Sequence, residues 1–226
     1  MSTSNETSGP ATDRTRIRRL PELGAYERET IDAILDEAIV CHLGFVHEEQ
    51  PFVIPTLHAR IGDELFVHGS AAGRTLRNLS SGVAACVEVT LLDGIVLARS
   101  TFESSVNYRS VVILGTAQPV EEREGKLAAL EAFTEQLVPG RWADSRQPTD
   151  QELKATSVLR LPLEECSAKV NAGGPDDSDS PDAELDIWAG VIPLRTVSGD
   201  PVPDPALKPG LSTPEYTIGY RRPGWD

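Results

Sequence analysis

The sequence has few aromatic residues, few sulfur-containing residues and no long apolar runs. Aromatic residues make up 5% of the 226 residues, and there are three cysteines and one methionine. Cys41, Cys86 and Cys166 are far apart, without a Cys-x-x-Cys pair, so we expect neither a disulfide framework nor a structural zinc site. No run is long enough for a membrane helix, and the N-terminus lacks the apolar core of a signal peptide. We therefore expect a cytoplasmic protein without membrane segments.

Positive charge is also scarce. Lys and Arg total 21 against 35 Asp and Glu, which gives a formal net charge of -14 at pH 7. Such a chain repels a phosphate backbone, so nucleic acid is not an expected partner. An anionic ligand must instead be bound by a few basic residues gathered at one place.

The pattern of apolar residues predicts two main helices and many strands. Helical spacing appears over 27–38, where Ile31, Ile34, Leu35 and Ala38 share one face, and again over 122–137. Thr149 and Glu152 form a possible capping box for a short helix. Strands are expected at 40–46, 52–60, 64–68, 83–92, 95–100, 108–120, 157–162 and 166–171. Tight-turn sequences such as Asp93-Gly94 separate them, so the expected fold is mainly β, an antiparallel barrel with flanking helices.

Composition divides the chain into four parts. Residues 1–13 are expected to be a disordered tail, 14–171 the barrel, 172–186 a solvated acidic linker, and 187–226 a docking segment followed by an extended tail. The basic run Arg14–Arg19 is either a solvated arm or an arm packed over a partner subunit or an anion. The sequence leaves both readings open.

The stretch from Leu65 to Leu79 is the first candidate binding site. It reads as a strand, a small-residue loop from Gly69 to Gly73, and a helix that begins at Arg74. Unpaired N–H groups at the start of that helix, the Ser70 hydroxyl and the Arg74 guanidinium suit a phosphate dianion. The pattern is neither a P-loop nor a dinucleotide fingerprint, and the alternative is a plain β-to-α turn with a solvent-facing arginine.

A second polar cluster precedes the most apolar strand. Asn107, Tyr108, Arg109 and Ser110 bring an amide, a phenol, a guanidinium and a hydroxyl to a strand entrance. Polar groups at such a place must find partners. They are either turn hydrogen bonds or a second clamp on the same anionic ligand.

Catalysis by protein groups alone has little support in the sequence. The four histidines, His42, His47, His58 and His68, include no His-Glu-x-x-His, so no metal site is predicted. A Gly-x-Ser-x-Gly elbow is absent, as is a papain-like cysteine signature.

Several motifs in one order resemble a known family. They are Arg16-Ile-Arg-Arg19, Ile34–Ala38, His42–Phe45, Pro55-Thr56, Phe66–Arg74, Asn107–Val111, Gly115 and Trp188–Val191. Together they resemble the pyridoxamine 5'-phosphate oxidase-like flavoproteins, and within them the nitroimidazole-resistance, nitroreductase-like branch. The resemblance spans residues 15–194. It implies a split β-barrel that binds FMN, in a homodimer with flavin at the subunit interface.

The resemblance also implies roles for individual residues. Arg74 matches the basic phosphate ligand, with Gly69 and Ser70 in the phosphate loop, and Pro55 and Thr56 match the strand along the isoalloxazine. His68 matches a histidine near the flavin and is the candidate catalytic residue, or else a histidine at the edge of the core. Trp188 either covers the ring or docks as a hydrophobe. The matching cofactor-binding residues are Pro55, Thr56, His68, Gly69, Ser70, Arg74, Asn107, Tyr108, Arg109, Ser110 and Trp188.

The chain also departs from the family pattern. Many members carry histidines where this chain has Glu103 and Ser104, and the substrate-phosphate residues of true pyridoxamine phosphate oxidases are not recognisable. We expect an FMN-dependent oxidoreductase that reduces a small organic molecule, for instance a nitroaromatic one. The alternative is a non-enzymatic flavin- or haem-binding protein. The physiological substrate, the electron donor and a deazaflavin in place of FMN stay open.

Overall fold

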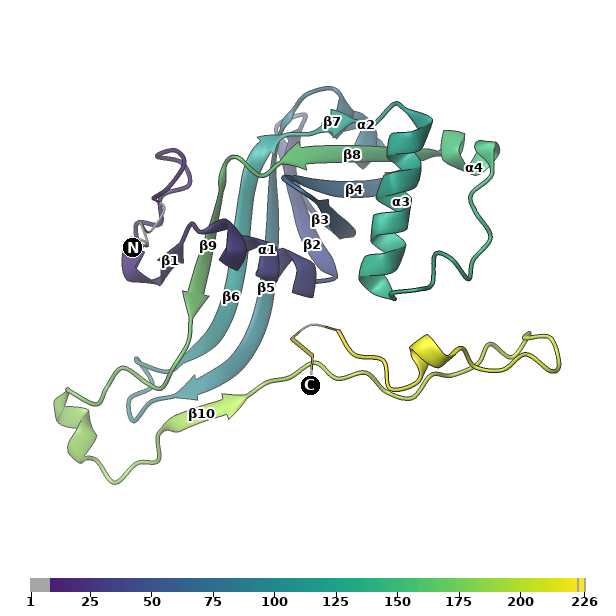
Figure 1. The fold of residues 1–226 in the computed structure, drawn as a ribbon. Coiled ribbons are helices and arrows are strands. Elements are labelled where there is room, and N and C mark those ends of the chain that lie inside the picture. Colours follow the sequence, from purple (N-terminus) through teal and green to yellow (C-terminus); the bar gives the residue numbers. More distant parts are fainter. Residues whose placement is uncertain (1–8, 223, 226) are drawn as a thin grey trace, which may run out of the picture.

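The computed structural model describes residues 9–222 and 224–225. Within them, ten strands form one antiparallel sheet in the order β1-β9-β6-β5-β2-β3-β4-β8-β7, and β10 pairs with β5 (Figure 1). The strands are β1 (Gly24–Ala25), β2 (Val40–His47), β3 (Gln50–Ile61), β4 (Glu64–Ser70), β5 (Ala84–Leu97), β6 (Ser105–Thr116), β7 (Gln118–Pro119), β8 (Thr156–Pro162), β9 (Cys166–Asn171) and β10 (Gly190–Pro193).

Strand β3 joins the two halves of the sheet. Its residues 50–57 pair with β2, and its residues 58–61 pair with β4, so the sheet turns a corner within this strand. The main apolar core lies inside the resulting curve, and its fully buried residues include Leu43, Leu65, Val87 and Ile113. This arrangement confirms the predicted antiparallel split barrel with flanking helices.

The helices are α1 (Arg28–Glu37), α2 (Arg74–Ser80), α3 (Arg123–Leu137) and α4 (Asp150–Ala155), with short 3₁₀ turns at Pro21–Leu23, Pro181–Glu184 and Glu215–Thr217. Helix α1 buries Ile31, Ile34 and Leu35, as the spacing predicted. Helix α3 covers the second half of β3 through Ala129 and Phe133. The capping box of Thr149 and Glu152 is confirmed at α4. None of the described helices is long and apolar enough to cross a membrane.

The predicted turn at Asp93-Gly94 was wrong. Strand β5 continues through these residues to Leu97, and the register opposite β6 shifts between Leu92 and Gly94. Strand β10 passes so closely that a Cβ on Gly94 would lie 3.0 Å from the Val191 side chain. Gly94 therefore lies at a β-bulge, and its lack of a side chain allows β10 to pack closely against β5.

Two segments outside the predicted barrel make specific contacts with it. In the predicted solvated linker, Asp177 is 1% exposed and accepts hydrogen bonds from the Arg99 backbone N–H and guanidinium, both at 2.7 Å. The predicted docking segment does pair with β5 through β10, yet the Trp188 side chain stays 66% exposed. Most of the predicted disordered tail, residues 1–8, lies outside the described residues.

Candidate functional site

The loop between β4 and α2 carries the first predicted cluster. The N–H groups of Ala71, Ala72 and Gly73 all donate within the chain, and those of Ala72 and Gly73 bond to Ser70. A Cβ on Gly73 would lie 2.9 Å from the Ser70 carbonyl oxygen, so only glycine fits this turn. The N–H groups of this loop already donate hydrogen bonds within the chain. An anion at this loop would therefore be bound mainly by the charged side chain of Arg74.

Arg74 is held by an aromatic ring rather than by a carboxylate. Its guanidinium carbon lies 5.0 Å from the centre of the Phe52 ring, and Phe52 stacks on Phe45 with centroids 5.5 Å apart. Among the described residues, no acidic side chain forms an ion pair with Arg74. A ring face attracts the cation without neutralising it, so the full positive charge stays available to a ligand.

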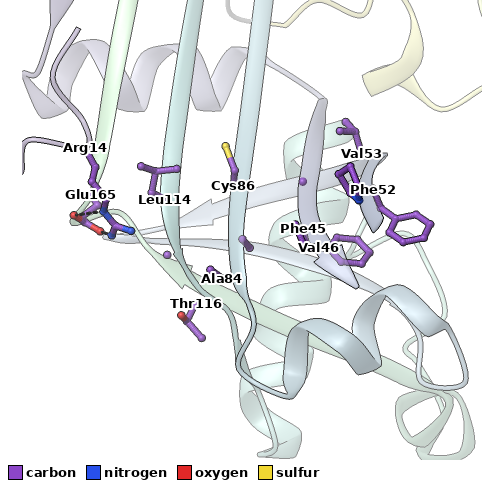
Figure 2. Close-up of a pocket in the computed structure, with 14 residues that line it drawn as sticks. Arg14, Phe45, Val46, Phe52, Val53, Ala84, Cys86, Leu114, Thr116 and Glu165 are labelled. Carbon is purple, nitrogen blue, oxygen red and sulfur yellow. Dashed lines mark hydrogen bonds and ion pairs between the residues drawn. The ribbon is translucent and has the colours of Figure 1, made fainter. Parts of the chain in front are cut away.

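An open cavity of about 620 Å³ begins at these two phenylalanines. In Figure 2, Phe45 and Phe52 lie at one end and the Arg14–Glu165 ion pair lies at the other. The floor is made of small and apolar residues on four neighbouring strands, and a Cβ added to Gly115 would meet nothing within 4 Å. The lining residues are Arg14, Gly44, Phe45, Val46, Pro51, Phe52, Val53, Ala84, Ala85, Cys86, Leu114, Gly115, Thr116 and Glu165.

The strand residues predicted to follow a flavin ring lie beside this cavity. Pro55 is two residues from Val53 on β3, so both side chains share the outer face of the sheet. Across the strand pair, Pro55 faces His42 of β2, which in turn faces Glu88 of β5. The neighbouring Thr56 is half-buried and pairs with Cys41, whose side chain points into the core. The outer face thus continues from the cavity to His42.

The second predicted cluster is occupied by contacts within the chain. Arg109 forms paired hydrogen bonds with Glu37 at 2.5 and 2.9 Å and with Asp93 at 2.7 and 2.9 Å. Asp93 first and Glu37 second raise the pKa of Arg109 further above its usual range. The Asn107 amide donates to the Gly173 carbonyl at 2.9 Å.

The hydroxyl of Ser110 donates to the Lys169 carbonyl at 3.4 Å, and Tyr108 is half-buried opposite Leu92. The hydrogen bonds of Asn107, Arg109 and Ser110 therefore connect β6 to α1, to β5, to β9 and to the chain just after β9.

The two clusters lie at opposite ends of the barrel. Helix α2, which begins with Arg74, packs against β7. Arg109 lies nine residues before Gln118 of β7 along an extended chain, so the two residues are separated by roughly 30 Å. Figure 1 shows α2 at the top, whereas the first residues of β6 lie at the bottom. Within one protomer they do not meet around a single phosphate. A joint role for Arg74 and Arg109 stays a prediction that requires a second copy.

His68 and Trp188 are the remaining predicted residues. The His68 ring lies 4.3 Å from the Phe133 ring, and burial lowers the pKa of His68. Its Nδ1 is buried without a hydrogen-bond partner among the described residues. His68 therefore points toward α3, and neither it nor Trp188 lines the cavity. Their cofactor roles stay predictions.

No function was predicted from the sequence for Phe52, His42 or Glu88. Alternation along β2 and β3 places His42 and Pro55 on one face, and this signal was present in the sequence. The cross-strand partner Glu88 was not visible, because it depends on the pairing of β2 with β5.

Comparison with known proteins identifies the family. The family model described as "Pyridoxamine 5'-phosphate oxidase" matches residues 27–170. The chain belongs to the pyridoxamine 5'-phosphate oxidase family. The matched range holds the Arg74 loop, the cavity floor and His42, but it ends before Trp188 and the C-terminal tail. No curated protein matches the chain.

Solved structures of pyridoxamine 5'-phosphate oxidase-like proteins share this fold. The flavocytochrome Anf3 from Azotobacter vinelandii is 39% identical, with a TM-score of 0.90 over 95% of this chain and 100% of that one. The FAD and heme binding protein from Mycobacterium smegmatis is 38% identical, with a TM-score of 0.82 over 87% and 98%. A putative 5-nitroimidazole antibiotic resistance protein from Bacteroides thetaiotaomicron is 22% identical, with a TM-score of 0.55 over 65% and 86%, and shows the fold alone.

Proposed function

We propose that the chain is a flavin-dependent oxidoreductase whose flavin lies on the outer face of β2, β3, β5 and β6. The phosphate of the flavin binds Arg74, and the ring system extends over the cavity toward Pro55. The flavin supplies the electron transfer, so the protein needs only to bind its phosphate, orient the ring and leave one ring face accessible. No classical catalytic cluster is then required.

The observation that carries this proposal is that no acidic side chain among the described residues forms an ion pair with Arg74. In a chain of net charge -14, an arginine without an acidic partner in the described part of the molecule rests on Phe52, a residue that lines an open apolar cavity. An anionic group attached to a flat, largely apolar ring matches both features at once. The flavin mononucleotide part of FMN and of FAD has this chemistry.

We further propose that the active unit is a homodimer formed through the same face. Val40, Val46 and Val53 share the outer face of β2 and β3, and all three are at least 44% exposed. Apolar residues gathered on one exposed face are typical of an interaction surface. A flavin on this face would then lie between two subunits.

Haem binding is a second candidate function. Two relatives at 38% and 39% identity are a flavocytochrome and an FAD and heme binding protein, and each is matched over at least 98% of its length. Identity at this level over the full length favours a haem beside the flavin in this chain as well. The flavin could then pass its electrons either to the small organic substrate expected from the sequence or to the haem.

The test is the absorption spectrum of the purified full-length protein, with the released cofactor identified by mass. We expect flavin bands that bleach under anaerobic reduction and return when an electron acceptor is added. The mass distinguishes FMN, FAD and a deazaflavin. A protein that neither carries a flavin nor binds added FMN or FAD would overturn the proposal.

A further inference from the structure

His42 differs from the buried histidines in having an accessible ring nitrogen. Its side chain is 49% exposed on the outer face of β2, and no hydrogen bond within the described chain engages its Nε2. His58 is 2% exposed, and its Nε2 donates to the Leu35 carbonyl at 2.9 Å. His68 packs against Phe133 instead. Of these three, only His42 is open to a ligand that approaches from outside.

Glu88 lies beside the other nitrogen of the His42 ring, Nδ1. Its Oε2 lies 3.4 Å from His42 Nδ1, and the Thr90 hydroxyl contacts Oε1 of the same carboxylate. A carboxylate beside Nδ1 favours the tautomer that is protonated there, which leaves the Nε2 lone pair free. Metal-binding histidines are commonly oriented by a carboxylate in this way.

The surroundings of His42 suit a porphyrin better than a bare metal ion. No three His, Cys, Asp or Glu residues gather to hold a metal anywhere in the described ranges. A porphyrin brings its own four nitrogens, so a single imidazole completes its binding to the protein. Pro55 lies directly opposite His42, and Gly44 follows two residues later on the same face, so these neighbours of His42 are small or apolar.

Cys86 is the other potential iron ligand on this face. It lies two residues from Glu88 and lines the cavity. Burial, followed by the charge of Glu88, raises the pKa of Cys86, which keeps the sulfur as a neutral thiol. Because the thiolate is the form that binds metals, Cys86 is the weaker candidate.

We propose that His42 Nε2 is the protein ligand of a haem iron and that Glu88 is the residue that positions its ring. The proposal rests on the haem-binding part of the proposed function and names its site. His42 and Pro55 are direct cross-strand neighbours, whose Cβ atoms are about 5 Å apart in such pairs. A haem on His42 and a flavin along Pro55 would therefore be in contact.

The test is a titration of haemin into the flavin-loaded full-length protein, followed by the Soret band and by flavin fluorescence. The wild type is expected to give the spectrum of histidine-ligated haem and to lose flavin fluorescence. His42→Ala should bind haemin at least about 10-fold more weakly and lose the ligated spectrum. Glu88→Gln should weaken binding about 10-fold or more while it keeps the spectral type.

His47→Ala is the matched control. His47 ends the same strand, its side chain is 32% exposed, and its Nε2 lies 3.9 Å from a carboxylate oxygen of Glu48. It pairs with neither Pro55 nor Glu88, the two cross-strand neighbours of His42. Its titration should equal that of the wild type. Retained flavin binding in each variant shows that the fold is intact.

Two outcomes would overturn the inference. One is a His42→Ala protein that binds haemin with the wild-type spectrum and affinity. The other is a wild-type protein that retains its flavin but gives no haemin spectrum, which leaves the flavin function standing. Absence of flavin from the wild type is a separate result, because it contradicts the flavin function itself.

Discussion

Arg74, the first residue of α2, and Arg109, within β6, both lie near the protein surface, yet their electrostatic surroundings are opposite. Arg109 is bound by two carboxylates, one of which, Glu37, has a side chain only 11% exposed. Arg74 rests on the Phe52 ring and has no acidic partner in the part of the chain that the structure describes. The charge of Arg109 is therefore compensated by carboxylates, whereas the charge of Arg74 is not.

Under the proposed function, this difference separates an arginine that serves the fold from one that is available to a ligand. A guanidinium with two carboxylates has its donors satisfied, and an incoming phosphate would have to displace those partners. An uncompensated guanidinium beside a cavity gains a partner when a phosphate binds. Both residues are arginines, so residue type does not distinguish a structural arginine from one that can bind a ligand. The presence or absence of a counter-ion does distinguish them.

Loss of the Arg109 side chain should have the largest effect on stability. Arg109→Ala leaves the nearly buried carboxylate of Glu37 unpaired, and removal of one partner from such a pair costs about 3 kcal/mol of unfolding free energy. Urea denaturation of the cofactor-free protein measures the change. Arg18→Ala is the control, because Arg18 and its partner Asp13 are both more than two-thirds exposed, and it should change stability by less than about 0.5 kcal/mol. Equal effects of the two substitutions would remove the structural role given to Arg109.

Loss of the Arg74 side chain should instead affect the ligand. Arg74→Ala removes a charge-assisted interaction of about 2 kcal/mol, which corresponds to roughly 30-fold weaker binding of FMN or FAD, with little change in unfolding free energy. A fluorescence titration measures the affinity. Arg77→Ala is the matched control, since Arg77 is exposed in the same helix, and it should bind flavin as the wild type does. Unchanged affinity in Arg74→Ala would place the phosphate elsewhere.

Local sequence patterns were sufficient to predict much of the fold. Helix α1 follows from the spacing of Ile31, Ile34 and Leu35, and the cap of α4 follows from Thr149 and Glu152, because each depends on residues within a few positions of one another. Asp93-Gly94 shows the limit of this approach. Its composition is equally typical of a hairpin turn and of a bulge, and only the approach of β10 from far along the chain decides between them.

The candidate site was predictable only in part, for the same reason. The Arg74 loop is a continuous motif, and its place at the end of β4 was correct. The state of Arg109 depends on Glu37, which is 72 residues away in the sequence. The pairing of His42 with Glu88 likewise depends on strand order. The sequence around a charged residue therefore predicts in which element its side chain lies. Residues far away in the sequence determine whether that side chain is paired within the chain or available to a ligand.

A change of pH tests the structural side of the comparison separately. His58 lies under the last turn of α1, close to the helix end that carries Glu37, and burial lowers the pKa of His58 below its usual 6.5. The unfolded chain thus binds a proton that the folded chain rejects, so stability falls as the pH falls below about 6.5. This histidine should contribute a loss of at most about 1 kcal/mol between pH 6.5 and 5.5. Urea denaturation at both pH values, compared with His58→Gln, isolates the contribution, and identical pH dependence of the two proteins would contradict it.

The smallest expected effect concerns the ring that supports Arg74. Phe52→Leu keeps an apolar side chain but removes the ring face, and a cation–π contact at an exposed site is worth about 0.5–1 kcal/mol. We therefore expect roughly three-fold weaker flavin binding, measured by the same titration. Phe102→Leu is the control, because Phe102 is 88% exposed at the tip of the β5–β6 hairpin, far along the chain from the cavity. If Phe52→Leu leaves the affinity unchanged while Arg74→Ala weakens it, then the charge of Arg74 alone binds the phosphate, and its placement by the ring contributes nothing.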